Sequence, residues 1–236
     1  MSTLSTPHRS MPSSNGVPLL VNGDRMKQPE FHRRYLAYPD YVKFELIGGI
    51  VYMASPLRYT HGRYSQLLST VFGFYAAATP GVEGADNVTT ILGEESEPQP
   101  DLALRLLPEY GGQSHVDEDE YLRGAPELLA EVAYSSRAID LNQKRADYEG
   151  AGVQEYLVLS IEERQLHWFH FAKAEVIRPN RQGVSRSVVF PGLWIDNAAL
   201  VARDSARPIE VAQQGLASRA HAAFVKRLQA AHRKHS

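Results

Sequence analysis

The stretch PELLAEVAYSSRAIDLNQKRADYEGAGVQEYLVLS, residues 126–160, decides the fold. Its two ends, PELLAEVA and YLVLS, are continuous apolar runs, which is typical of strands covered on both faces. Between them, Ser135 or Ser136 can cap a helix over residues 137–150, which a following glycine can end. If the two strands are parallel, this order gives a right-handed crossover. The stretch therefore predicts an α/β fold with a central sheet.

Three charged residues lie within segments that otherwise have the pattern of core. Asp101 opens the apolar run DLALRLL, Glu131 lies in the middle of ELLAEVA, and Lys144 lies on the helix that follows. Lys144 shares a stripe with Leu141 and Tyr148 at steps of three and four residues, so it lies on the inward face of that helix. A carboxylate inside an apolar strand is costly unless it is neutralised, so Glu131 requires a cationic partner.

Two acids and a lysine in such positions suit a magnesium-dependent phosphodiesterase centre. Hydrolysis of a phosphodiester needs a cation to neutralise developing charge, an activated water, and a donor to the oxyanion. Mg²⁺ prefers oxygen ligands and keeps several waters, so Asp101, Glu131 and the backbone carbonyl of Val132 would suffice. We expect Mg²⁺, or Mn²⁺ in its place, at these ligands. Lys144 would orient the attacking water or contact the scissile phosphate.

The rest of the chain predicts further strands and a long helix. YVKFELI and IVYMA, joined at Gly48-Gly49, have the pattern of a hairpin with a two-residue turn. A helix of about five turns is expected in residues 58–81, where Tyr64 and Leu68 belong to a stripe that continues through Val71 and Tyr75. The other strand signals are VTTIL, DLALRLL, QLHWFHF and, as a last edge segment, VVFPGLWID.

One principal domain is expected between two dissimilar ends. Residues 1–29 are rich in Ser, Pro, Asn and Gly, and predict a flexible leader. Residues 30–200 carry the strand and helix patterns, and residues 201–236 form a basic, helix-prone tail. The cations of this tail include Arg219, Lys226, Arg227, Arg233 and Lys234.

Composition excludes several classes of protein. With 43% hydrophobic and 22% charged residues, the 236-residue chain has the make-up of an ordinary globular protein. The absence of cysteine excludes disulfides, a thiol nucleophile and a cysteine-type zinc site. No run has the length of a signal peptide or a membrane helix, so a cytoplasmic location without a membrane partner is expected. Since the formal net charge is -2, nucleic-acid binding would need a local positive surface.

Seven features follow one another along the chain: FELIGGIVYMASP, a later His61, PQPD, PELLAEVAYSS, DLNQK with Tyr148, AGVQEYLVL and FPGLWID. In order and spacing they resemble the Uma-two family of restriction-endonuclease-like proteins, which belongs to the PD-(D/E)XK nuclease superfamily. An ordered run of matches over roughly residues 30–200 is far more specific than any one motif. The resemblance implies a restriction-endonuclease-like mixed central sheet flanked by helices, and a metal-dependent endonuclease acting on nucleic acid, with DNA the expected substrate. A homodimer is a further expectation at the level of the family.

The resemblance also assigns roles to individual residues. It implies that Asp101 and Glu131 are metal ligands, that Lys144 is the catalytic lysine, and that Glu45 contacts a second metal or a metal-bound water. The superfamily motif usually places its lysine two residues after the second acid, where this chain has Ala133. The lysine must therefore come from the following helix, and Lys144 is the matching candidate.

Each of these residues also has a structural interpretation. Asp101 can hydrogen-bond local backbone at the mouth of a strand. Glu131 and Lys144 can form a buried ion pair, Lys144 can pair with Asp140, and Glu45 can be a solvated strand residue. The alternative function is then a catalytically inactive nuclease-fold module that binds nucleic acid or protein. His61 shares a stripe with apolar residues, which favours a satisfied helix histidine over a ligand.

Overall fold

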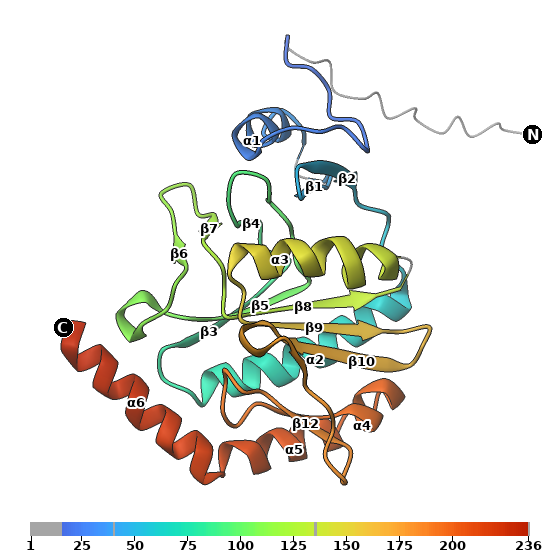
Figure 1. Cartoon of the computed structure of the whole chain (residues 1–236). Helices are drawn as coiled ribbons and strands as arrows, with labels where there is room; N and C mark the ends of the chain where they lie inside the picture. The colour runs from blue at the N-terminus through green and yellow to red at the C-terminus, as the bar shows by residue number, and fades with distance from the viewer. Residues whose placement is uncertain (1–15, 40, 135, 236) are drawn as a thin grey trace, which may run out of the picture.

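The computed structural model describes residues 16–39, 41–134 and 136–235, and its centre is a six-stranded sheet between helices (Figure 1). The neighbouring strands β8 and β9 are parallel, whereas every other pair in this sheet is antiparallel. The expected mixed central sheet is confirmed. In spatial order the strands are β11 (Glu175–Val176), β10 (Gln165–His170), β9 (Glu155–Ser160), β8 (Leu128–Ala133), β5 (Leu102–Leu106) and β3 (Val82–Asp86).

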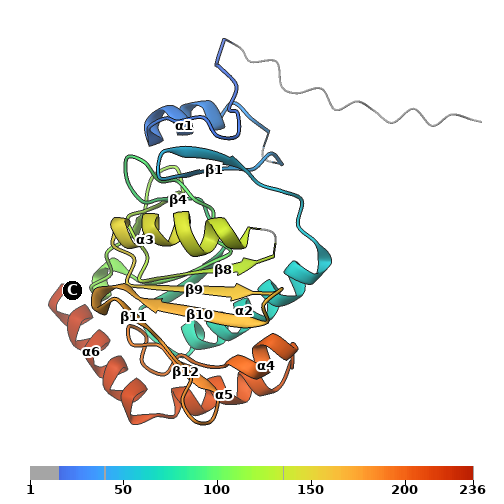
Figure 2. The same ribbon diagram turned by 45° about the vertical axis from the view of Figure 1, so that its right-hand side comes forward.

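The predicted crossover is present in residues 126–160. Strands β8 and β9 are buried along their whole length. The connecting helix begins with a π-helical segment, η2 (Ile139–Lys144), and continues as α3 (Arg145–Ala151). It ends at Gly152, whose φ of 93° is a left-handed conformation that glycine adopts without a steric penalty. Figures 1 and 2 show this helix lying across one face of the sheet.

The predicted inward stripe of this helix is confirmed. Lys144 and Tyr148 are buried, Leu141 and Ala151 are half-buried against the same apolar cluster, and Asp140 is buried as well. The predicted cap at Ser136 is wrong, because its hydroxyl donates to Asp140 Oδ2 (2.5 Å) instead of capping the backbone. Ser135 lies outside the described residues.

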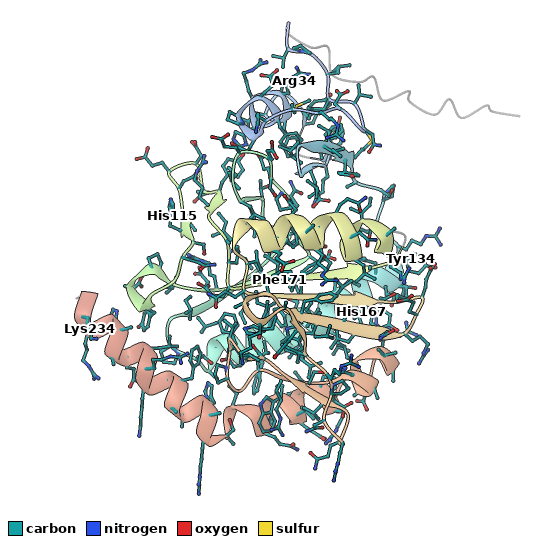
Figure 3. All side chains as sticks on the ribbon, in the orientation of Figure 1. Arg34, His115, Tyr134, His167, Phe171 and Lys234 are labelled. Carbon is teal, nitrogen blue, oxygen red and sulfur yellow. The ribbon has the colours of Figure 1, made fainter. Side chains whose placement is uncertain are left out.

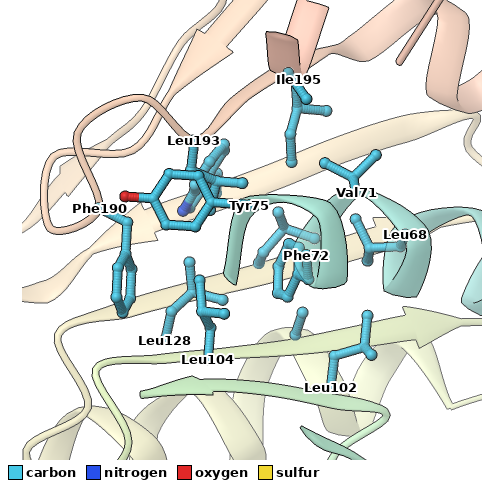
Figure 4. Packing of buried hydrophobic residues seen from close by; sticks show 14 of the residues in the cluster. Leu68, Val71, Phe72, Tyr75, Leu102, Leu104, Leu128, Phe190, Leu193 and Ile195 are labelled. Carbon is cyan, nitrogen blue, oxygen red and sulfur yellow. The ribbon is translucent and has the colours of Figure 1, made fainter. Parts of the chain in front are cut away.

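Helix α2 (Tyr59–Ala77) covers the other face of the sheet. Its predicted stripe is buried, and Figure 4 shows Tyr75 above Leu104 and Leu128, and Leu68 above Leu102. Successive side chains of a strand point to opposite faces. Since the even-numbered residues of β8 face α2, the odd-numbered ones face α3. This alternation directs residue 131 toward the crossover helix.

The N-terminal part forms a small layer above α3 (Figure 1). The predicted hairpin is confirmed as β1 (Phe44–Ile47) and β2 (Ile50–Met53), and both of its turn glycines have positive φ. With α1 (Gln28–Tyr35), the hairpin encloses its own apolar cluster, which includes Leu20. Of the predicted leader, residues 1–15 lie outside the described part of the chain.

Three strand predictions need correction. Strand β3 was not predicted, because Glu83–Asp86 is exposed and shows no apolar alternation. VTTIL contributes only β4 (Thr90–Ile91), which joins a separate small sheet. VVFPGLWID contributes β13 (Trp194–Asp196), which pairs with β12 (Val184–Arg186) away from the central sheet. The remaining short elements are β6 (His115–Val116), β7 (Leu122–Arg123), and the 3₁₀ turns η1 (Pro108–Tyr110) and η3 (Phe171–Lys173).

The C-terminal residues are helical and pack on the α2 side of the sheet. They form α4 (Asn197–Ala202), α5 (Arg207–Leu216) and α6 (Arg219–His235). Ala212, Phe224 and Leu228 belong to the main apolar cluster, so this segment contributes to the core. No helix in the described ranges is long and apolar enough to cross a membrane.

Replacing Phe224 by alanine tests whether α6 is an integral part of the core. Phe224 is 2% exposed and packs edge-to-face on Phe190, so we expect Phe224→Ala to lower the free energy of unfolding by about 3–5 kcal/mol. Urea unfolding followed by the fluorescence of buried Trp168 measures the change. The exposed control Lys226→Ala should stay within about 0.5 kcal/mol of the parent. Equal stability of the two variants would contradict the packing of α6.

Candidate active site

Lys144 is buried among three carboxylates. Its Nζ lies 2.8 Å from Glu131 Oε1, 3.0 Å from Glu45 Oε1 and 3.9 Å from Asp140 Oδ1. Burial lowers the pKa of Lys144, but the negative charges of these neighbours, Glu131 first, more than compensate and hold that pKa well above its ordinary value. The lysine is therefore an ammonium ion enclosed by protein.

Glu131 faces α3, as the strand alternation requires. Its Oε1 accepts hydrogen bonds from Lys144 Nζ and from the Tyr148 hydroxyl, at 2.8 and 3.0 Å. Burial raises the pKa of Glu131 well above the ordinary range, Lys144 opposes this, and the charge of Asp101 adds to the rise. The Glu131 carboxylate is thus fixed in place by Lys144 and Tyr148.

Glu45 brings the N-terminal hairpin to the site. Its Oε1 accepts from Lys144 Nζ and also from the backbone N–H of Gln99, at 2.8 Å. Gln99 belongs to the PQPD segment, and its side chain donates to the Tyr35 hydroxyl. The interpretation of Glu45 as a solvated strand residue is therefore wrong, because this carboxylate joins the hairpin to the crossover helix.

Asp101 lies at the start of β5 and points across to β8. Its Oδ2 accepts from the backbone N–H of Val132 at 2.7 Å. In an extended strand the N–H and C=O of one residue point to the same side, so the Val132 carbonyl also faces β5. This agrees with Ala133, whose carbonyl accepts from Ile161 on the β9 side. Asp101 and the Val132 carbonyl therefore occupy one strand end.

His61, which the sequence analysis interpreted as a satisfied helix histidine, has Asp101 of the candidate site as its partner. It is buried on α2, and its Nε2 lies 3.2 Å from Asp101 Oδ2. The hydrogen bond to Asp101 is the main cause of the raised pKa of His61. A signal was present in the sequence, since a histidine on the stripe of Tyr64 and Leu68 must face the sheet and find a polar partner there.

Asp140 is the second addition to the predicted set. Burial raises its pKa to about 6, although Lys144 and the hydroxyl of Ser136 oppose the rise. Its Oδ1 is buried without a hydrogen-bond partner among the described residues. Asp140 lies four residues before Lys144, on the same face of the helix, and Leu141 beside it packs against the apolar cluster.

The residues present fit a hard divalent cation. Within the described residues no three Asp, Glu or His side chains form a cluster that could hold a metal ion by themselves. However, the hydrogen bonds of Asp101 and Glu131 use one oxygen each, Oδ2 and Oε1. The second oxygen of each carboxylate and the Val132 carbonyl are hard oxygen donors. Such a set suits Mg²⁺, which completes its octahedron with water.

A mixed sheet with a parallel crossover, whose strands and crossover helix bring carboxylates and a lysine together, is the arrangement of a restriction-endonuclease-like fold. The chain belongs to the Uma2 family, described as "putative restriction endonuclease", whose model matches residues 29–199. Among solved structures, it resembles a "putative nuclease belonging to DUF820" from Anabaena variabilis. The two share 13% sequence identity and a TM-score of 0.58 over 72% of this chain and 97% of the other. No curated protein gives a significant match.

Removing the Lys144 charge tests whether the ammonium holds the site together. We expect Lys144→Met to lower the free energy of unfolding by about 3–5 kcal/mol at pH 7, because Glu131 and Glu45 are left buried without their cation. Urea unfolding measures the loss. Lys173→Met makes the same chemical change at an exposed position and should be nearly neutral. If Lys144→Met is as stable as this control, the ion pairs do not stabilise the fold.

Asp140 should make stability depend on pH. Its folded-state pKa of about 6 lies above the ordinary value of 3.8, so between these pH values the folded protein binds the proton more tightly than the unfolded chain. The stability from Asp140 is therefore full below this window and is lost as the pH rises through about 6. Relative to wild type, Asp140→Asn should gain up to about 3 kcal/mol across the window.

The comparison of unfolding free energies at pH 4, 5, 6 and 7 measures this effect. Asp119→Asn, an exposed aspartate control, should run parallel to the wild type throughout. A constant difference between Asp140→Asn and wild type over the whole range would show that Asp140 does not titrate in this window.

Proposed function

We propose that the protein is a metal-dependent endonuclease that hydrolyses phosphodiester bonds of nucleic acid, with DNA the expected substrate. The observation that carries this proposal is the convergence of Glu131, Lys144 and Glu45 from three separate elements. Family membership supports nuclease function in general. The catalytic roles below are the specific part of the proposal.

Asp101, Glu131 and the Val132 carbonyl would hold Mg²⁺ or Mn²⁺. When bound, the ion would neutralise charge on the phosphate and acidify a water. Lys144 carries the proton donors of the site and would orient the attacking water or donate to a phosphate oxygen. Glu45 and Glu131 hold the Lys144 ammonium in position, and Tyr148 fixes Glu131.

A catalytically inactive binding module is the second candidate function. It is favoured by the engagement of Lys144 with two carboxylates at once, an arrangement that serves as a structural ion pair without any metal. Thermal melting with and without Mg²⁺ or Mn²⁺ separates the two, since a ligand that binds only the folded state raises its stability by mass action. A shift that is lost in Asp101→Ala favours the metal-dependent enzyme.

The homodimer and the cytoplasmic location remain predictions from the family and from the sequence. Two centres in a dimer would allow both strands of a duplex to be cut. Solution mass by light scattering tests the dimer, and a monomeric mass at micromolar concentration would contradict it.

The decisive experiment is a cleavage assay on plasmid, linear duplex, single-stranded DNA and RNA with Mg²⁺ or Mn²⁺. We expect cutting by the wild type, its loss in EDTA, and a loss of at least about 100-fold in Glu131→Ala or Asp101→Ala. Glu149→Ala removes an exposed glutamate from the same crossover helix and should keep full activity. Activity that survives both Glu131→Ala and Asp101→Ala would refute the site.

A further inference from the structure

Tyrosines and cations lie at the surface near the candidate active site. We define the rim surface as Lys43, Tyr52, Arg58, Tyr59, Arg63 and Tyr134. The most exposed member is Tyr59, with 79% of its surface in solvent, and the neighbouring Leu57 is 67% exposed. Large apolar groups gathered at a protein surface are typical of binding sites.

The rim surface borders the site at two points in the chain. Tyr59 opens α2 two residues before His61, which contacts Asp101. Tyr134 follows the last residue of β8, two residues after Val132. The Arg58 guanidinium lies 5.1 Å from the centre of the Tyr134 ring and so joins the two segments. Figures 1 and 2 agree that the chain between β2 and α2 passes the end of β8.

The hairpin contributes the other side of the rim surface. Glu45 and Tyr52 are directly paired across β1 and β2, so their side chains lie on the same face. Lys43 is two residues from Glu45 and shares that face. Since Glu45 contacts Lys144, this is the face of the hairpin that turns toward the site.

The cations of the rim surface are available to an anionic partner. Lys43, Arg58 and Arg63 are exposed, and none of the ion pairs found among residues 16–39, 41–134 and 136–234 uses them. Tyr59 and Arg63 are four residues apart on α2 and therefore lie side by side. The rim surface thus alternates aromatic rings with positive charge.

We propose that the rim surface binds an unpaired nucleic-acid strand and selects single-stranded or locally melted substrate. Exposed rings stack on bases and neighbouring cations bind phosphates, which is how proteins hold single strands without reading sequence. In a duplex the faces of the bases are already stacked, so Tyr59 could not engage them. This inference rests on the proposed function, because it names the substrate class of the same site.

A second basic surface, on α6, provides a matched control. Its cations Arg219, Lys226, Arg227, Arg233 and Lys234 are exposed, but its aromatic residue Phe224 is buried. Figure 3 shows Lys234 and Tyr134 at opposite sides of the molecule. The α6 surface therefore carries positive charge but offers no phenylalanine or tyrosine ring of its own for stacking, so the single strand is not expected to bind there.

Fluorescence anisotropy with the full chain in EDTA tests the inference without cleavage. The probes are labelled oligo(dT), oligo(rU) and a mixed-sequence duplex of equal length, and comparison of the first two separates DNA from RNA. We expect either single strand to bind at least ten-fold more tightly than the duplex. Tyr59→Ala should weaken single-strand binding roughly ten-fold, whereas Tyr59→Phe, which keeps the ring, should bind like wild type.

The charge arm compares Arg58→Ala with Arg233→Ala on α6. Arg58→Ala should weaken single-strand binding and should lower the slope of log affinity against log salt concentration by about one, the value for one phosphate contact. Arg233→Ala should change neither quantity. Equal affinity for single strand and duplex, or an unchanged affinity in Tyr59→Ala, would overturn the inference. Single-strand binding without any metal-dependent cutting would refute the proposed endonuclease but not the rim surface. Metal-dependent cutting by the wild type, together with unchanged single-strand binding in Tyr59→Ala, would refute the rim surface but not the proposed endonuclease.

Discussion

The buried ammonium of Lys144 is the interaction on which the site depends. It contacts Glu131 on β8 and Glu45 on β1, so one side chain ties the crossover helix to the sheet and to the hairpin. Each of these charges would be costly to bury alone, and the cost falls only when all three are assembled. The assembly therefore has a defined geometry that an apolar contact would not impose.

Strand geometry places Glu131, Asp101 and the backbone of Val132 at the site. Alternation along β8 turns Glu131 toward the crossover helix, while the backbone of Val132 faces β5 and meets Asp101. The helix on the opposite face supplies His61 to the same carboxylate. Both faces of the sheet thus contribute to one strand end, which explains why the site residues are widely separated in sequence.

The sequence permitted prediction of the parts of this site that local patterns encode. A carboxylate in a continuous apolar strand and a lysine on an inward stripe are visible in Glu131 and Lys144, and both are buried as expected. Asp140 was considered only as a partner of Lys144 four residues away, because no local pattern shows that its carboxylate is buried in the site. His61 was interpreted as a satisfied helix histidine whose partner could not be named, because periodicity does not reveal which strand end α2 contacts. Strand β3 was not predicted because its residues are mostly exposed and show no apolar alternation.

The carboxylates of the site outnumber its lysine, and this excess of negative charge favours the binding of a further cation. Glu131, Glu45 and Asp140 surround a single lysine, Asp101 adds its charge to that of Glu131, and burial raises the pKa of both Glu131 and Asp140. An added cation between the carboxylates would offset their repulsion, whereas a phosphate would be repelled there. Around the rim surface the sign is reversed, with cations exposed beside tyrosine rings. A negative interior beside a positive, aromatic surface would suit a metal ion among the carboxylates and a nucleic-acid strand on the rim surface, which are the two ligands that the proposed metal-dependent nuclease would hold.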